Sequence, residues 1–404
     1  ELDGTTPILG APVPSALTGF SYVEGFGPSN ERSFNVSAIN LTSPVIIEAP
    51  ATYEISLSAG SGYQSSLSLP STTSILNTNI FVRLKAGFLI NDYNDSVKVS
   101  VSGLRTYYVK CYGVVMPNRF YVDSYNGDDN NPGTEARPWK NVSVLNNTIF
   151  REGAQIFLKC GSRWRGQQLK FKGSGTSAKP IIVSSYGTGA KPLLAGNGLT
   201  GEAVVYLYNQ QYIEISNLEI TNTPNEPFNG DFFVGLYNST GNNPNPMGAD
   251  RRGVMVALDD FGEANHIYLK NLNIHHIKGQ LGSGDVSVNG AIPKRTGGIY
   301  FAVLNNREQT SSKSRFDSVL IDGCTISYAE NIGIAFDNEW NVYYPGGNEY
   351  NDWYSRRFSN VRISNNKIDH IGKNAMIVRC TDETGLVERN KCSYTAMGTT
   401  GNTM

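Results

Sequence analysis

Apolar and polar residues alternate in short runs along this chain, and five segments share one template. Each is an alternating run that ends in a small or polar residue, usually Asn or Gly, and is followed by one more apolar position. The segments span residues 212–220, 266–274, 318–326, 360–368 and, more loosely, 384–392. This pattern predicts a strand, a tight corner and a second strand. The shortest interval between starts, 24 residues from 360 to 384, is typical of one solenoid turn, and the longer intervals indicate inserted loops.

A second family of apolar runs keeps the same spacing. These runs span residues 253–258, 298–303, 333–338 and 375–380. Two strand families with one spacing predict a right-handed parallel β-helix. The alternative is an ordinary β-sandwich with Asn-rich turns.

The N-terminal part has a different pattern. Residues 1–20 are rich in Pro, Gly and Thr and are interpreted as a tether. Residues 21–115 contain about seven short alternating runs, which predict an immunoglobulin-like β-sandwich. The fold class is therefore all-β, with a sandwich followed by a β-helix over residues 118–404.

Two stretches resemble known families. Residues 26–57 resemble an Ig-like module of cell-surface and secreted proteins of Bacteroidetes-type bacteria. That resemblance implies an extracellular or outer-membrane surface location, with possible attachment through the N-terminus. It leaves open whether the module is a spacer or binds a sugar or partner.

The second resemblance begins at residues 120–140, FYVDSYNGDDNNPGTEARPWK, and continues through Gly161-Ser-Arg-Trp164 and residues 173–187. This stretch is similar to the opening of the pectin-lyase-like β-helix superfamily, which implies a first coil. Residues 138–149 place Trp139, Val142, Leu145 and Ile149 at helical intervals and predict a helix that caps the open end. The chain stops within a turn, so we expect further coils or another cover at the C-terminal end.

The composition of the chain limits the kinds of function that it can have. The net charge is −1 and charged residues make up 17%, which argues against nucleic acid as a partner. No apolar stretch is long enough to span a membrane. The five cysteines lack metal-site spacing and suggest neither disulfides nor a zinc site. A polar, weakly charged, Tyr-rich surface suits polysaccharides or other glycans, and the oligomeric state is not indicated.

Candidate catalytic residues come from the second strand family. If its alternate apolar residues point inward, one outward face collects Asp259, Tyr300, Asp337, Glu339 and Arg379. Asp259 and Glu339 would lie two strands apart, roughly 9 to 10 Å along the axis. An inverting glycosidase uses two carboxyl groups about 6.5 to 9.5 Å apart. Surface carboxylates that only face solvent are the alternative.

A polysaccharide lyase would use other groups. It needs a cation to neutralise a uronate carboxylate and a base to remove the α-proton. Arg379, Tyr300, Lys294, Arg295 and His276 are available for these tasks, but none matches a lyase motif.

Candidate sugar-binding residues lie in two long insertions, residues 224–252 and 342–357. Aromatic rings among amides and carboxylates are suited to sugars, whose C–H faces pack on rings. The predicted wall of a groove over the acids consists of Trp340, Tyr343, Tyr344, Trp353 and Tyr354. Packing of these rings against the solenoid is the alternative.

Three further groups of residues are interpreted as structural. His276, Tyr328 and His370 fall in one predicted column at a corner. Asn217, Asn271 and Asn365, with Gly323 in the same register, predict an internal Asn ladder. Asp123, Asn126, Asp128, Asp129 and Asn130 offer oxygen ligands for Ca²⁺, but without EF-hand spacing a capped turn is favoured.

The sequence therefore predicts an extracellular carbohydrate-active enzyme that cleaves glycosidic bonds. Hydrolysis is slightly favoured over elimination, since two carboxylates are easier to place than a uronate-neutralising metal. A non-catalytic surface protein that binds glycans is the alternative.

Overall fold

The computed structural model describes residues 6–71, 75–225, 250–279, 296–304, 314–338 and 356–397, without the side chains of residues 337 and 338. The chain forms two compact units, Glu1–Asn118 and Arg119–Met404. Each unit is described separately below.

The N-terminal unit is a sandwich of two mostly antiparallel sheets, as predicted. One sheet has the order β1 (Ile8–Leu9), β3 (Arg32–Ile39), β7 (Leu76–Leu84), β5 (Tyr53–Ser56). The other has the order β2 (Ala16–Val23), β9 (Tyr107–Met116), β8 (Asn91–Ser100), β4 (Val45–Glu48), β6 (Ser66–Leu69). Alternate residues of these strands are buried between the sheets, where Phe20 and Tyr53 meet edge to face at 5.1 Å.

Parts of residues 6–20 form strands, although the sequence suggested a tether up to residue 20. β1 pairs with β3, and β2 pairs in parallel with β9. Leu17 and Phe20 are buried in the sandwich core, and this burial holds β2 in the sheet. The Pro- and Gly-rich composition concealed the alternating apolar positions.

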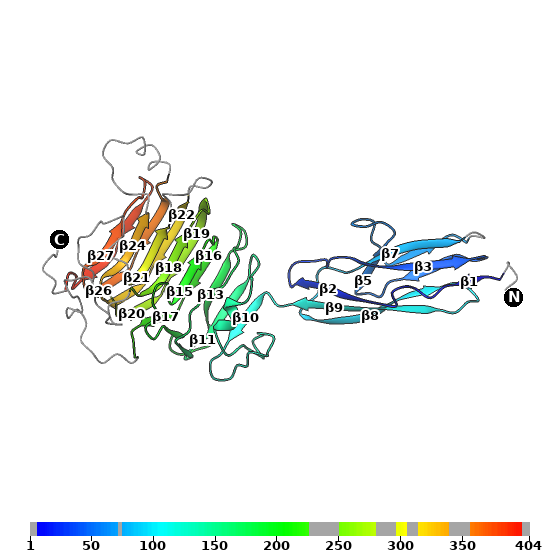
Figure 1. The fold of residues 1–404 in the computed structure, drawn as a ribbon, viewed down its shortest axis with the longest axis horizontal. Helices are drawn as coiled ribbons and strands as arrows, with labels where there is room; N and C mark the ends of the chain where they lie inside the picture. The colour runs from blue at the N-terminus through cyan, green and yellow to red at the C-terminus, as the bar shows by residue number, and fades with distance from the viewer. Residues whose placement is uncertain are drawn as a thin grey trace. The chain divides into compact units, whose positions relative to one another are not determined.

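The C-terminal unit is a parallel β-helix, as predicted (Figure 1). Its first sheet contains β10 (Arg119–Val122), β11 (Gln155–Lys159), β13 (Ile181–Tyr186), β16 (Ile213–Ser216), β19 (Glu263–Lys270), β22 (Arg315–Asp322), β25 (Ser359–Ser364) and β28 (Leu386–Glu388). Its second contains β12 (Arg163–Arg165), β14 (Leu193–Ala195), β17 (Glu219–Asn222), β20 (Asn273–Ile277), β23 (Thr325–Ala329), β26 (Lys367–Ile371) and β29 (Lys391–Ser393). Its third contains β15 (Val205–Tyr208), β18 (Arg252–Leu258), β21 (Gly297–Val303), β24 (Ile332–Asn338) and β27 (Asn374–Val378).

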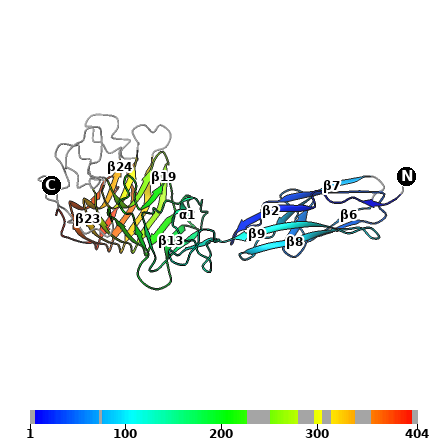
Figure 2. The ribbon, with the colours of Figure 1, turned by 60° about the horizontal axis from the view of Figure 1, so that its bottom comes forward.

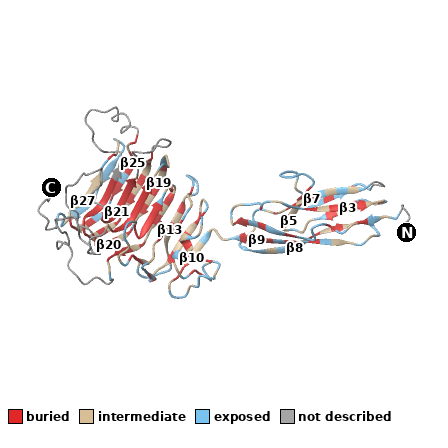
Figure 3. Ribbon diagram, viewed as in Figure 1, coloured by how far each residue is buried: buried red, intermediate tan, exposed pale blue. Residues whose placement is uncertain are grey.

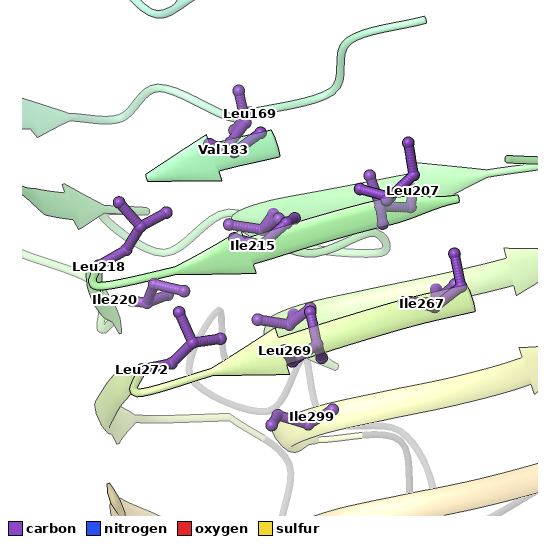
Figure 4. Packing of buried hydrophobic residues seen from close by; sticks show 14 of the residues in the cluster. Leu169, Val183, Leu207, Ile215, Leu218, Ile220, Ile267, Leu269, Leu272 and Ile299 are labelled. Atoms are coloured by element: carbon purple, nitrogen blue, oxygen red, sulfur yellow. The ribbon is translucent and has the colours of Figure 1, made fainter. Parts of the chain in front are cut away.

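The strand families predicted from the sequence correspond to these sheets. Each template segment supplies a strand of the first sheet, a corner and a strand of the second, as in β16 and β17. The second strand family forms the third sheet. Apolar residues at equivalent positions of successive coils stack inside the solenoid, for example Ile215 near Leu269 and Leu218 near Leu272 (Figure 4). Phe301 and Phe336 stack at 4.6 Å between ring centres and extend this core.

The predicted helix is shorter than the pattern suggested. α1 (Ser143–Asn146) is a single turn beside the first rungs of the solenoid (Figure 2). Val142 and Leu145 are buried, whereas Ile149, also expected on the apolar face, is 73% exposed. Ile149 lies beyond the end of the turn, so the helical spacing no longer applies there.

The corner residues between the first and second sheets adopt left-handed backbone conformations. Asn217, Asn271, Gly323 and Asn365 have φ values of 60°, 52°, 64° and 58°. Asn and Gly occur at these positions because they tolerate this conformation best. The predicted ladder is not internal, however, because Asn271 donates to the Asn217 side chain in an exposed bond of 2.7 Å.

An internal Asn side chain lies one residue further along, at Asn366. Its Oδ1 accepts a bond of 2.8 Å from the Cys324 N–H, and its Nδ2 donates to the Ile321 carbonyl at 3.0 Å. Only 1% of Asn366 is exposed. Asn366 therefore satisfies the backbone of a neighbouring coil inside the corner.

Replacing Asn366 with Ala is expected to lower the free energy of unfolding by about 1 to 3 kcal/mol, because two buried backbone groups lose their partner. Urea denaturation followed by circular dichroism measures the change. The control is Asn365→Gly, an exposed position where the left-handed backbone suits Gly. An equal, small effect of both substitutions would contradict the assignment.

An aromatic ladder runs along the outer edge of the second sheet. The rings of His276, Tyr328, His370 and Tyr394 stack with centre distances of 5.0, 4.7 and 4.7 Å. All four residues have φ between 47° and 54°. The predicted column exists and continues to Tyr394, and its regular stacking is that of a structural ladder.

The acidic loop near the start of the β-helix is built of capped turns. Asp123 accepts backbone bonds from Tyr125 and Asn126, and Asp129 accepts them from Lys140 and Asn141. These carboxylates stabilise the loop by pairing its backbone N–H groups. Within the ranges that the structure describes, no group of three His, Cys, Asp or Glu residues is arranged for a metal ion.

Candidate active site

The candidate site lies on the outer face of the third sheet, the sheet of β15, β18, β21, β24 and β27. Register places Ala257 beside Ala302 and Ala302 beside Asp337. Phe336 pairs with Val378, so Asp337 and Arg379 follow at corresponding positions. The backbone column proposed from the sequence is therefore present.

The face differs from the expected exposed surface, because most of its outward residues are buried (Figure 3). They form a separate apolar cluster outside the coil: Ala203, Tyr206, Met255, Ala257, Tyr300, Ala302, Ile332 and Ala335. The outward positions are mainly small or aromatic, so they pack along the face instead of being solvated. Among the side chains that the structure describes on this face, the charged ones then lie at the ends of the strands.

Asp259 lies at one such end, directly after β18. Its backbone N–H donates to Asn209 Oδ1 at 2.8 Å, and Asn209 Nδ2 donates to its carbonyl at 2.9 Å. Asn209 has φ of 51°, which turns the chain after β15 so that its amide faces Asp259. This reciprocal pair fixes the backbone, while the Asp259 side chain stays half-buried.

Tyr208 contacts the carboxylate of Asp259. Its hydroxyl donates to Asp259 Oδ2 at 3.3 Å, and 42% of Tyr208 is exposed. Burial and the nearby Asp259 charge raise the pKa of Tyr208. The phenol therefore stays protonated and remains a donor to the carboxylate at neutral pH.

Tyr206 lies on the same strand, two residues earlier, with its ring centre 6.1 Å from that of Tyr208. Burial, with the Glu202 charge as a second cause, raises the pKa of Tyr206 to about 12. The sequence reasoning missed both tyrosines. The signal was present, because the run at 203–208 precedes segment 212–220 as the run at 253–258 precedes segment 266–274.

Two cations lie over aromatic rings of this face. Lys170 Nζ is 4.9 Å from the centre of the Tyr206 ring and pairs with Glu202 at 2.5 Å. The Arg252 guanidinium is 5.1 Å from the centre of the Tyr300 ring and donates to the Gly201 carbonyl at 2.5 Å. These contacts order the face through cation–π attraction and hydrogen bonds.

The other predicted catalytic residues are placed less favourably or lie outside the described residues. Tyr300 is 3% exposed within the apolar cluster, so the expected exposed base is instead a packed ring. Arg379 is exposed just beyond β27, and Asp337 is defined by its backbone register alone. The residues outside the described ranges are Glu339, Trp340, Tyr343, Tyr344, Trp353, Tyr354, Lys294 and Arg295.

A pocket of about 330 Å³ opens beside Tyr208. The segment at 170–174 forms one wall, and Tyr208, Asn209 and Gln210 form the other. Because Tyr208 lines the pocket and bonds Asp259, the pocket and the carboxylate belong to one locality. This locality combines an ordered acid, a tyrosine donor and a concave surface, which are components of a glycosidic cleavage site.

No protein-family model matches the chain, and no curated protein matches it. Two solved structures of GH136 lacto-N-biosidase from Eubacterium ramulus are similar to it. The selenomethionine derivative aligns with a TM-score of 0.52 and 26% identity, covering 64% of this chain and 42% of that one. The native protein gives 0.51 and 26%, covering 63% and 42%.

The chain thus resembles a β-helix carbohydrate enzyme in fold. It spans less than half the length of that enzyme. Within the part of this chain that the structure describes, no helix is both long and apolar enough to cross a membrane.

Proposed function

We propose that this chain is a glycoside hydrolase that acts on a polysaccharide or glycan outside the cell or at its outer surface. The observation that carries the proposal is Asp259, held by Asn209 and contacted by Tyr208 beside an open pocket. The similarity to lacto-N-biosidase structures supports hydrolysis of a glycosidic bond. The location is proposed from the resemblance of residues 26–57 to a surface-protein module.

In the proposed reaction, Asp259 is one of two carboxyl groups that flank the scissile bond. Tyr208 donates to its Oδ2 and orients the carboxylate. Asp337 is the proposed second acid: its strand lies two strand spacings from β18, roughly 9 to 10 Å, and its register partner on β18 is Ala257, two residues before Asp259. The two backbone positions are therefore farther apart than the roughly 5 to 5.5 Å between the carboxyl groups of a retaining enzyme, and the proposal is an inverting mechanism with a water molecule between the acids.

The proposal predicts new reducing ends when the chain is incubated with a panel of polysaccharides and oligosaccharides. Ultraviolet absorbance of the same samples reports the unsaturated sugar that elimination would leave. Reducing ends without absorbance support hydrolysis, whereas both signals together would identify a lyase. Glycan binding without either signal would favour the non-catalytic surface protein.

A further inference from the structure

The five-stranded sheet of the N-terminal unit carries exposed aromatic rings on β9. Burial alternates along this strand, so Tyr108, Lys110, Tyr112 and Val114 point away from the sandwich core. Tyr108 is 59% exposed and Tyr112 is 43% exposed. The outward side chains of β8 and β9 form the tyrosine face. Exposed rings on one side of a single strand make this face suited to contact with another molecule.

The neighbouring strand places hydrogen-bonding groups beside these rings. Register puts Asn94 of β8 next to Tyr112. It puts Lys98 next to Tyr108, and Ser96 lies between Asn94 and Lys98 on the same outward side. Sugars are bound by this combination, because their C–H faces pack on aromatic rings while their hydroxyl groups bond to amide, hydroxyl and ammonium groups.

The outer side of the sheet has no excess charge. On its five strands, all of which the structure describes, the outward charged residues are Glu48, Asp92, Lys98 and Lys110. Lys98 and Glu48 pair at 2.8 Å, which leaves one charge of each sign. A polyanion needs an excess of positive charge, so the tyrosine face favours an uncharged ligand.

The outer side of the other sheet of the sandwich differs, because its polar groups bond to one another. Asn35 donates to the side-chain oxygens of Asn77 and Asn79 at 2.6 and 3.1 Å. Arg83 pairs with Glu54 at 2.7 Å. Groups that already bond to one another are less available to a ligand, so the tyrosine face is the better candidate of the two.

The spacing of the rings determines the length of the ligand. Tyr108 and Tyr112 are four residues apart on one strand, so their Cα atoms are separated by roughly 13 Å. One pyranose ring cannot pack on both tyrosines at once. A sugar ligand that contacts both is therefore an oligosaccharide that lies along β9.

From these observations we infer that the tyrosine face binds an uncharged oligosaccharide chain, with separate sugar units packed on Tyr108 and Tyr112. Asn94 and Ser96 bond to the hydroxyl groups of the sugars. The inference goes beyond the proposed function, because it concerns a second glycan site on a different unit and requires no bond cleavage. Such a site would keep the protein on a polymeric glycan.

The test uses ligand-observed NMR titrations of the full chain carrying Asp259→Asn, so that the proposed hydrolysis does not consume the probes. The neutral probes are cellohexaose, xylohexaose and mannohexaose, each with its own disaccharide, and hexagalacturonate is the acidic probe. At least one neutral hexasaccharide is expected to bind, about ten-fold more tightly than its disaccharide, because only the longer chain reaches both rings.

Tyr108→Ala and Tyr112→Ala are each expected to weaken binding of that hexasaccharide about three- to ten-fold, through loss of one ring contact. Both positions are exposed, so the variants should fold, which circular dichroism checks. Asn94→Ala, also at an exposed position, keeps the test decisive if a ring variant does not fold, and should weaken binding about two- to five-fold. The matched control is Tyr125→Ala, which removes a 70% exposed ring from the other unit and should leave binding unchanged.

The inference is overturned if no neutral hexasaccharide binds, if only hexagalacturonate binds, or if the three variants on the tyrosine face bind as tightly as the parent chain. It is also overturned if light scattering shows a dimer that Tyr112→Ala dissociates, because the face would then contact a second copy of the chain.

The outcomes for the tyrosine face and for the proposed function are separable. Hexasaccharide binding that depends on Tyr108 and Tyr112, in a protein whose unchanged chain cleaves no glycan, would refute the hydrolase and keep the binding site. Hydrolysis by the unchanged chain, with hexasaccharide binding that neither tyrosine variant affects, would do the reverse.

Discussion

Replacing Asp259 with Asn is expected to lower kcat for glycan hydrolysis by about 100- to 10,000-fold. The reason is that an amide can neither protonate a leaving oxygen nor activate water, and general acid–base catalysis contributes factors of this size. The fold should be unaffected, because Asn209 bonds to the backbone of Asp259 and not to its carboxylate. Initial rates of reducing-end release on the substrate found in the panel measure the effect.

The matched control is Asp260→Asn at the next position. Asp260 is exposed and has φ of 48°, a conformation that Asn tolerates, so this variant removes one negative charge without strain. It should retain most of the activity. If Asp259→Asn and Asp260→Asn had similar activities, Asp259 would be excluded as a catalytic acid or base.

The sequence predicted the β-helix because the solenoid repeats its constraints on every rung. Each coil needs an inward apolar row and a residue that tolerates the left-handed corner, so Asn217, Asn271, Gly323 and Asn365 recur in register. The sandwich was predicted for a similar reason, since alternation follows directly from two packed sheets. The fold class, all-β with these two units, is confirmed by the sheet order.

The site was only partly predictable, because side-chain burial depends on neighbours that alternation does not specify. Register correctly aligned Ala257, Ala302 and Asp337, but period-two alternation cannot tell an outward solvated row from an outward packed one. Tyr300 was therefore expected to be accessible and is buried. Tyr208 and Gln210 were missed because β15 is short and pairs with only one named strand, β18.

A column of glycines sets the position of the strands that bear the candidate acids. Gly253, Gly298 and Gly333 are the second residues of three strands of the third sheet, and a Cβ at each would meet the Cγ2 of an Ile from the second sheet. The distances are 2.6 Å to Ile274, 2.6 Å to Ile326 and 2.8 Å to Ile368. The paired isoleucines form a continuous ladder, so the glycines leave the space that this ladder fills.

Replacing Gly333 with Val is expected to lower the free energy of unfolding by at least about 3 kcal/mol. A Cβ there would lie 2.4 Å from the Ala375 carbonyl oxygen, which belongs to the next rung, so the backbones of β24 and β27 must separate. Overpacking of a dense core costs about 1 to 3 kcal/mol and more when backbone must move. The free energy of unfolding of Gly333→Ala should lie between those of Gly333→Val and the unchanged chain. Thermal denaturation of all three proteins measures the series.

The control for this series is Gly385→Ala, because its nearest neighbour would be the Asp382 carbonyl at 3.3 Å in an exposed turn. It should shift the melting temperature little. Because Asp337 follows Gly333 on the same strand, separation of β24 from β27 also displaces the proposed second acid, so activity should fall in Gly333→Ala even where the protein remains folded. A stable, fully active Gly333→Val protein would mean that the rungs can separate here without cost and that the glycine column does not position the site.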